Sequence, residues 1–138
     1  MTHFAISVID TKSAKLEHEF PINAAHVEAM ALEKSGPRLF VNVTDKNYQA
    51  VVDRHSGKIL ARWYIAEAQQ NAPIAFEKPN KRLFVVCRAP GKLVVLDSTT
   101  GRSVASFPRA RGRMRSFSIQ CITGSTSLQA RAKPAERY

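Results

Sequence analysis

The sequence predicts an all-β fold built from repeated antiparallel units of four short strands. Two observations predict it: Val-, Leu- and Phe-rich runs alternate with turn residues through residues 4–108, and the pattern returns after 43 or 44 residues. The chain has 138 residues, of which 44% are hydrophobic. It is therefore long enough for one core and too ordinary in composition for wholesale disorder.

Two separate elements carry the repeat. The first begins at Asp10, Asp53 and Asp97, which are 43 and 44 residues apart. The second is Arg-Leu-Phe-Val, which starts at Arg38 and again at Arg82, and each Arg precedes its Asp by 15 residues. A shared spacing across two elements is hard to obtain by chance. We therefore expect equivalent positions for the two arginines and for the aspartates, with the aspartates capping turns rather than forming a carboxylate cluster.

Four strands per 44 residues is typical of one blade of a β-propeller. We expect strands, in chain order, at 27–33, 38–43, 48–53, 59–65, 82–87, 92–97 and 103–107. Gly57 and Gly101 fall in hairpin loops that require a positive φ. A β-sandwich of short strands is the alternative, but it does not explain why two elements repeat in phase.

The predicted domain is a partial β-propeller with four-stranded antiparallel blades and a repeat of 43–44 residues. It extends over residues 1–108 and comprises a blade remnant at 4–22 and complete blades at 26–65 and 73–108. A basic tail follows at 109–138, where Ser, Arg, Gln and Thr replace the alternating apolar pattern.

The repeat resembles the YVTN-type β-propeller repeat of bacterial and archaeal proteins. The resemblance rests on Ile-Ser-Val-Ile-Asp-Thr from Ile6, Gly-Pro-Arg-Leu-Phe-Val-Asn-Val from Gly36, and Lys-Leu-Val-Val-Leu-Asp from Lys92, followed by Thr100 and Gly101. It implies a propeller scaffold and leaves the function open, because such scaffolds serve many roles. The chain departs from the family in extent, since a closed ring holds about four to eight blades and this chain shows about two and a half.

A fragment of this kind leaves blade faces bare and strand edges unpaired. We expect such edges in residues 4–10 and 103–107, and we expect them to drive self-association. No apolar run reaches the length of a membrane helix, and the N-terminus lacks the pattern of a signal peptide. A cytoplasmic location is therefore expected, although proteins of the resembled family are often periplasmic or secreted.

Propeller geometry gathers one set of loops at one end of the ring, and these are the segments 23–26, 44–48, 69–73 and 88–92. The polar candidates for ligand binding in or beside them are His26, Asn42, Asn71 and Arg88. The alternative for these four is that they are ordinary solvated loop residues. A protein or a small molecule would be the ligand.

The sequence shows no catalytic, metal or cofactor motif. The four histidines have no ligand spacing, and there is no Gly-rich phosphate loop or nucleophile elbow. Cys87 lies in an apolar run and is expected to be a small buried hydrophobe. We therefore expect a protein that is not an enzyme and holds no cofactor, and an enzymatic subunit has only the analogy with other propellers in its favour.

Positive charge is concentrated in the tail. The chain has 21 Lys and Arg against 11 Asp and Glu, a net charge of +10, with a pI of about 10.1. Residues 1–108 hold 14 − 10 = +4 of this charge, and residues 109–138 hold 7 − 1 = +6. Nucleic acid is therefore a possible partner, and its candidate contacts are Arg109, Arg111, Arg113 and Arg115.

The loss of the repeat after Pro108, with a gain of Arg and Ser, predicts that the tail is an out-of-frame translation of the next blade. Read from the third base of each codon from Arg113 onward, permitted codons spell a segment with Phe six residues before Arg-Ile-Tyr-Val. That spacing matches Phe76 and Arg82. We then expect residues 109–138 to be disordered or poorly packed, with their charge an accident.

The function that the sequence predicts best is a non-catalytic propeller fragment that acts as a binding or scaffold module. The alternative is a nucleic-acid-binding protein that uses the basic tail and a propeller face.

Overall fold

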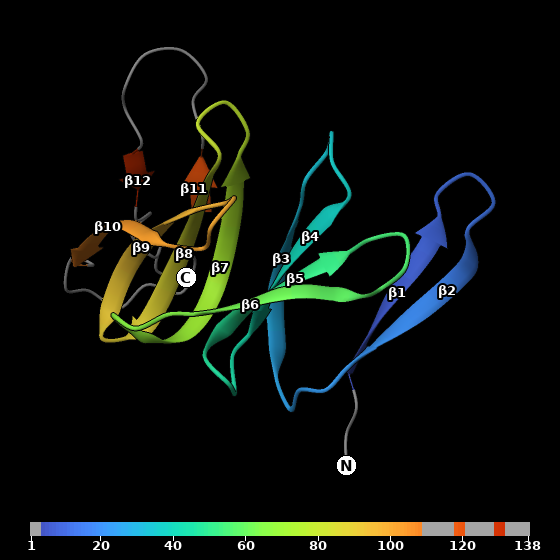
Figure 1. The fold of residues 1–138 in the computed structure, drawn as a ribbon, viewed down its shortest axis with the longest axis horizontal. Coiled ribbons are helices and arrows are strands. Elements are labelled where there is room, and N and C mark those ends of the chain that lie inside the picture. Colours follow the sequence, from blue (N-terminus) through green and yellow to red (C-terminus); the bar gives the residue numbers. More distant parts are fainter. Residues whose placement is uncertain (1–3, 109–117, 121–128, 132–138) are drawn as a thin grey trace, which may run out of the picture.

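The computed structural model describes residues 4–108, 118–120 and 129–131, and all its elements are β-strands (Figure 1). Two antiparallel sheets have four strands each, in the order β3-β4-β5-β6 and β10-β9-β8-β7. Two more sheets are hairpins, β1-β2 and β11-β12. None of the described residues belongs to a helix that could cross a membrane.

The strands of the first hairpin and the second sheet are β1 (Phe4–Asp10), β2 (Lys15–Ile22), β3 (Val27–Leu32), β4 (Arg38–Val43), β5 (Tyr48–Asp53) and β6 (Ile59–Tyr64). The strands of the third sheet and the second hairpin are β7 (Gln69–Glu77), β8 (Arg82–Ala89), β9 (Gly91–Asp97), β10 (Ser103–Pro108), β11 (Ser118–Gln120) and β12 (Gln129–Arg131). The all-β fold predicted from the sequence is confirmed.

The strand register confirms that the sequence repeat is a structural repeat. Arg38 lies opposite Asp53 in the second sheet, and Arg82 lies opposite Asp97 in the third. The irregularity between β5 and β6 at Val52 returns one repeat later between β9 and β10. The two four-stranded sheets therefore have the same register, strand for strand.

The repeated aspartates cap the turns that follow β1, β5 and β9. The Asp53 carboxylate accepts hydrogen bonds from the amides of Ser56 and His55, both at 2.9 Å. The Asp97 carboxylate does the same one repeat later, with the amides of Thr100 and Thr99. These amide donors hold the pKa of both carboxyls below the ordinary value.

The turns after β5 and β9 end in glycines with a left-handed backbone. Gly57 has φ +72° and Gly101 has φ +73°, as the hairpin loops require. Each turn is closed by the glycine amide, which donates to the carbonyl of the capping aspartate at 2.8 Å. The loop residues thus set the register of each outer hairpin.

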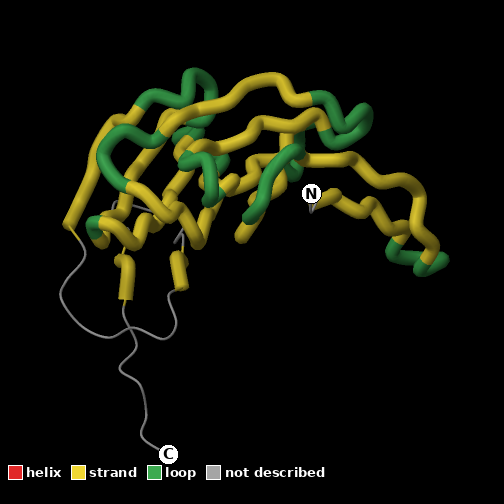
Figure 2. The backbone as a smooth tube through the Cα atoms, turned by 90° about the horizontal axis from the view of Figure 1, so that it is seen from below, coloured by secondary structure: helices red, strands yellow, loops and turns green. Residues whose placement is uncertain are grey.

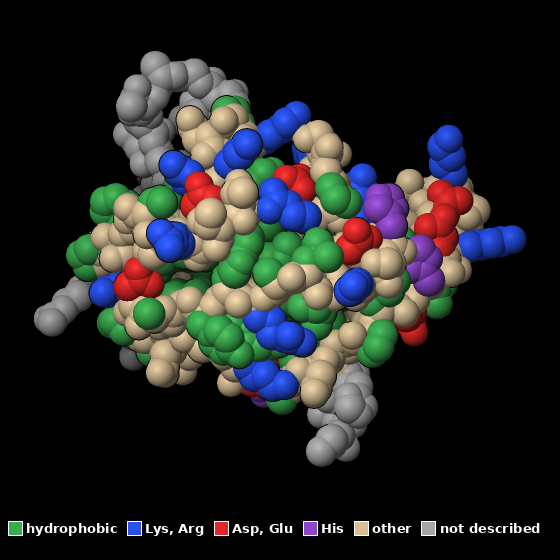
Figure 3. Space-filling view, viewed as in Figure 1, with side chains coloured by type: hydrophobic (Ala, Val, Ile, Leu, Met, Phe, Trp, Pro, Cys, Tyr) green, Lys and Arg blue, Asp and Glu red, His purple; other side chains and the backbone are tan. Residues whose placement is uncertain are grey.

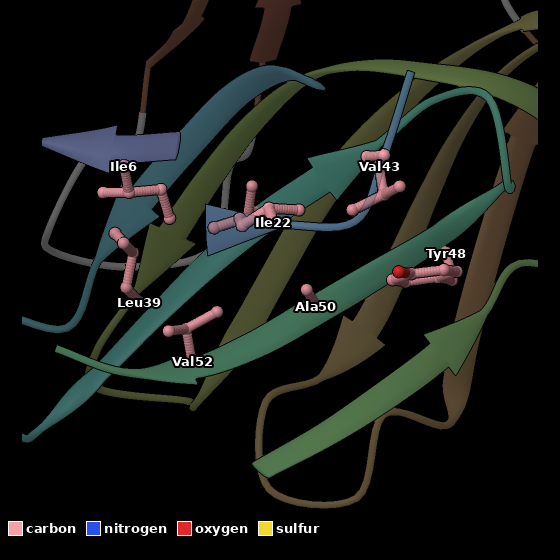
Figure 4. Packing of buried hydrophobic residues seen from close by; sticks show 9 residues of the cluster. Ile6, Ile22, Leu39, Val43, Tyr48, Ala50 and Val52 are labelled. Carbon is pink, nitrogen blue, oxygen red and sulfur yellow. The ribbon is translucent and has the colours of Figure 1, made fainter. Parts of the chain in front are cut away.

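The sheets follow one another along the molecule in chain order, and the innermost strands β3 and β7 lie side by side (Figures 1 and 2). One core lies between β1-β2 and the second sheet and contains Ile6, Ile22, Leu39, Val43 and Val52 (Figure 4). The second core lies between the two four-stranded sheets, and its members include Leu83, Val85, Cys87, Val94 and Leu96. Face-to-face stacking of four-stranded sheets around an axis is the arrangement of a partial β-propeller.

The hairpin β11-β12 lies at the place of the next sheet. β11 lies beside β7, and its residues follow 74–76 by one 44-residue repeat. β12 follows 85–87 by the same interval and pairs with β11 antiparallel. The predicted disorder and frame shift of the tail otherwise concern residues outside the described part of the chain, and the domain boundary after Pro108 stays a prediction.

Candidate binding surfaces

A network of buried amides joins the two four-stranded sheets. Asn42 on β4, Gln49 on β5 and Asn71 on β7 are completely buried. The Asn71 side-chain amide donates to Asn42 Oδ1 at 3.1 Å and to the Tyr48 carbonyl at 3.2 Å. Gln49 Nε2 also donates to Asn42 Oδ1, so this one oxygen accepts from both sheets. Buried amides of this kind need such partners to offset their desolvation.

The structure thus brings together Asn42 and Asn71, two of the four predicted ligand-binding residues. Their side chains contact each other and the backbone, since Asn42 Nδ2 donates to the carbonyl of Ala72. Neither side chain reaches solvent. In this arrangement the two amides hold the sheets together, and ligand binding by them stays a prediction.

The other two predicted residues lie at the surface and apart from this network. Arg88 on β8 binds Glu28 on β3 through two hydrogen bonds of 3.0 Å, which is a bidentate ion pair between the two sheets. His26 is exposed in the loop before β3, and its amide donates to the carboxylate of Asp45 at 3.2 Å. Ligand binding by His26 and Arg88 also stays a prediction.

An aromatic ring on a glycine is a contact that appears twice between successive sheets. A Cβ atom built on Gly57 would collide with the Phe20 ring, and one built on Gly101 would collide with the Trp63 ring. The two rings therefore lie directly on the two glycines, where any side chain would collide with them. Phe20 and Trp63 are 43 residues apart, and Phe107 follows Trp63 by 44.

Phe107 is the third member of this series, and 54% of it is exposed. It lies on β10, at the outer edge of the third sheet. No glycine covers it among the residues that the structure describes. Among the described residues the aromatic-on-glycine contact is thus made twice, and sequence reasoning missed it although the spacing of the rings is visible in the repeat.

A second contact between the sheets uses Arg38. Its guanidinium binds the Glu33 carboxylate through two hydrogen bonds of 2.9 and 2.7 Å and also donates to the carbonyl of Ser98 in the third sheet's last turn. The hydrogen bonds from Arg38 hold the pKa of Glu33 below its ordinary value. Arg38 also lies over the Phe40 ring, 5.1 Å from its centroid.

Cys87 on β8 is a free cysteine. Cys87 is completely buried, and burial raises the pKa of its thiol to about 11, so it is protonated at neutral pH. Within residues 4–108 and the two short strands beyond them, no three metal-ligating side chains lie close enough together to hold an ion. Cys87 packs as the small hydrophobe predicted from the sequence.

Charge on the visible face is mixed. Figure 3 shows Lys and Arg side chains scattered among acidic and hydrophobic ones rather than gathered in one basic patch. Arg109, Arg111, Arg113 and Arg115, the predicted nucleic-acid contacts, lie outside the described residues.

Comparison with known proteins supports the fold. No family model and no curated protein sequence matches the chain. Among solved structures, Sqt1 of Saccharomyces cerevisiae matches 91% of this chain with a TM-score of 0.70 at 12% identity. Hydrazine synthase of Kuenenia stuttgartiensis matches 77% with 0.67 at 18%, and the dihydro-heme d1 dehydrogenase NirN matches 75% with 0.63 at 18%.

The chain spans only part of each of these proteins. It covers 34% of Sqt1, 30% of hydrazine synthase and 23% of NirN. At such identities the likeness concerns the fold, and all three are propeller-type folds. Residues 4–108 therefore form part of a β-propeller.

Proposed function

We propose that this chain is a non-catalytic β-propeller fragment of the YVTN type that acts as a binding module through its blade faces. The observation that carries the proposal is Phe107, whose equivalents Phe20 and Trp63 each lie on the glycine of a following sheet. The scaffold thus presents a contact surface with no counterpart among the described residues. Exposed apolar surface of this kind marks interaction sites.

The opposite end of the fragment presents a second such surface. Met30 and Leu32 on β3 are each 48% exposed, whereas their equivalents one repeat later, Ile74 and Phe76 on β7, pack against the second core. The difference arises from the sheet that comes before each strand. β7 follows the four-stranded sheet β3-β4-β5-β6, whereas β3 follows the hairpin β1-β2, in which β1 is the inner strand and pairs only with β2. The edge of β1 that faces inward is also free of backbone partners among the described residues.

We propose that these edges and faces, in residues 4–10 and 103–107 together with β3, drive self-association of the chain. Sedimentation velocity from about 1 to 100 μM is the test, and we expect the average mass to rise with concentration. Leu32→Ser combined with Phe107→Ser is expected to reduce this rise. Leu60→Ser is the matched control, because Leu60 is 51% exposed but lies on β6, in the sheet that has neighbours on both sides.

A monomer over the whole concentration range contradicts self-association. An equal effect of the control and the double variant contradicts the assignment of the surface to β3 and β10.

A further inference from the structure

The face of the third sheet that points away from the second sheet carries the same cross-strand row of apolar residues as the face that receives the third sheet. On the second sheet, the receiving face is a cross-strand row, Ala31, Phe40, Val51 and Ala61, in which each residue pairs with the next. Phe40, Val51 and Ala61 belong to the core between the sheets. This row is the reference for the outer face of the third sheet.

One repeat later, the same row occurs on the outer face of the third sheet. It consists of Ala75, Phe84, Val95 and Ala105, again each paired with the next. A second row, Val86, Leu93 and Phe107, lies beside it and corresponds to Asn42, Gln49 and Trp63. All seven positions of this outer face are apolar, and every one of them follows its counterpart by 44 residues. We refer to these seven residues as the outer face.

The outer face is the next surface in a series of stacked sheets, in which two successive pairs of sheets already pack face to face. Two sheet-to-sheet cores repeat along the chain, and the residues that β7 and β8 of the third sheet contribute to the second one are Ile74, Phe76, Leu83, Val85 and Cys87. A sheet that packs on the outer face needs apolar residues at the same five positions. The complement of this face is therefore a pair of strands whose apolar residues have the spacing of Ile74, Phe76, Leu83 and Val85. Successive members of this set are 2, 7 and 2 residues apart.

The tail contains this spacing in an unexpected form. Ser116, Ser118, Ser125 and Ser127 are separated by 2, 7 and 2 residues. Four of the six serine codons begin with TC. When such a codon is read from the third base of the preceding codon, its T moves to the middle position. Every codon with T in the middle encodes Phe, Leu, Ile, Met or Val, whichever bases flank it.

The same shift of frame turns other positions of the tail into residues of the repeat. The codons of Thr123 and Gly124 then give an NGG codon, which can encode Arg, one position before the residue that Ser125 becomes. Arg82 stands in that place before Leu83. Permitted codons for residues 113–132 spell Asp-Ala-Val-Phe-Phe-Asp-Pro-Val-His-His-Arg-Ile-Tyr-Val-Ser-Ala-Gly-Glu-Gly. Aligned on its Arg, this segment has Val, Phe, Ile, Val and Ala at the five core positions.

We propose that the outer face is a blade-binding surface, and that its occupant is the blade that residues 113–132 encode when read from the third base of each codon. This proposal rests on the proposed function and deepens it, since it names what the outer face binds. The place of the occupant beside β7 is where β11 lies, but β11 and β12 have three residues each, whereas β7 and β8 have nine and eight.

The nucleotide sequence across codons 113–132 is the first test. We expect TC codons at the four serines and Arg at the shifted position between Thr123 and Gly124. AGT or AGC at two or more of these serines, or a stop codon in the shifted frame, overturns the proposal.

The second test is made on the full chain. Residues 113–131 are replaced by the nineteen-residue shifted segment, and in a control by the same nineteen residues in scrambled order. We expect the thermal midpoint of the first variant to exceed that of the control by at least about 4 °C. Amides of β8 and β9 are expected to exchange hydrogen more slowly in the first variant.

Equal midpoints of the shifted and scrambled variants overturn this inference and leave self-association of the original chain unaffected. A higher midpoint of the shifted variant, with an original chain that sediments as a monomer, supports this inference and overturns self-association.

Discussion

The two four-stranded sheets carry an arginine at the same position, yet Arg38 and Arg82 bind different partners. Arg38 holds Glu33 and reaches the carbonyl of Ser98 in the next sheet. Arg82 instead binds Asp97 of its own sheet at 2.8 Å. The register around the two is identical, so the difference lies in the side chains and turns beside them: the Ser98 carbonyl of the next sheet lies within reach of Arg38.

Glu33 and Glu77, which precede the two arginines by five residues, also bind different partners. Glu33 is occupied by Arg38, whereas its equivalent Glu77 accepts hydrogen bonds from the amide and side chain of Asn80, at 3.0 and 3.2 Å. A repeat therefore conserves backbone register more strictly than it conserves side-chain pairing. Side-chain pairing follows from what lies on the adjacent sheet.

The largest expected effect contrasts Phe40 with Phe84. Phe40→Ala should lower the free energy of unfolding by about 3–4 kcal/mol, because the ring is completely buried and lies 5.5 Å from Phe76 on the next sheet and 6.0 Å from Trp63 on its own sheet. Phe84→Ala should cost at least about 1 kcal/mol less, because Phe84 is 7% exposed and does not belong to either of the two cores between the sheets. Urea unfolding of both variants checks this, and equal losses would show that the outer face is as firmly packed as the inner one.

Next in size is the contact of aromatic rings with glycines. Gly101→Ala should cost about 2–3 kcal/mol, because a methyl group both collides with the Trp63 ring and is strained at a φ of +73°. Gly57→Ala should cost the same against Phe20. Gly36→Ala is the control, since Gly36 does not have a positive φ and its nearest atoms belong to the end of the Glu33 side chain rather than to a ring. If Gly36→Ala lowers the thermal midpoint as much as the other two variants do, the contact between ring and glycine is contradicted.

A smaller contrast separates the two arginines. Arg38→Met should lower stability by about 1–2 kcal/mol, since it removes three hydrogen bonds and leaves the partly buried Glu33 carboxylate without its partner. Arg82→Met should cost about 0.5 kcal/mol or less, as expected of a more exposed ion pair. If both variants unfold at the same urea concentration, the hydrogen bond from Arg38 to the Ser98 carbonyl contributes nothing to stability.

The smallest expected effect is on pH dependence. Hydrogen bonds from Arg38 lower the pKa of Glu33 in the folded chain relative to the ordinary value of 4.5. Its stabilising contribution is therefore fully present above that value and is lost as pH falls through the lower, folded pKa. Glu33→Gln should flatten the decline in stability as the pH falls below about 4.5, measured by urea unfolding at each pH. An unchanged slope would contradict the pairing.

The repeat made most of the fold predictable from the sequence. Register, turn positions and the positive φ of Gly57 and Gly101 all follow from local chemistry that recurs at a fixed interval. The observed strands lie within about two residues of the expected bounds. The first strand of the third sheet, β7, was placed only as part of a blade, because its run of Gln, Asn and Ala has little β-propensity.

The contacts between sheets were much less predictable. Asn42 and Asn71 were chosen as polar residues near a loop cluster, and nothing in a single sequence shows that they face each other across a closed interface. The ion pair between Arg88 and Glu28 joins residues 60 positions apart for the same reason. Such pairs depend on how two sheets are rotated against each other, which is a property of the packing and not of either strand.

The buried amides have a consequence for the order of the blades. One repeat after Asn42 and Gln49, the same positions hold Val86 and Leu93, so one stacking face is polar at its centre and the next is apolar. A blade that brings an amide like Asn71 satisfies the first face, whereas against the second it would bury a polar group without a partner, at a cost of about 1–3 kcal/mol. The polar and the apolar stacking face therefore favour different blades, although the blades are otherwise alike. The third sheet, which carries Asn71, packs on the polar face of the second sheet, and a copy of it would pack less well on the outer face of the third sheet.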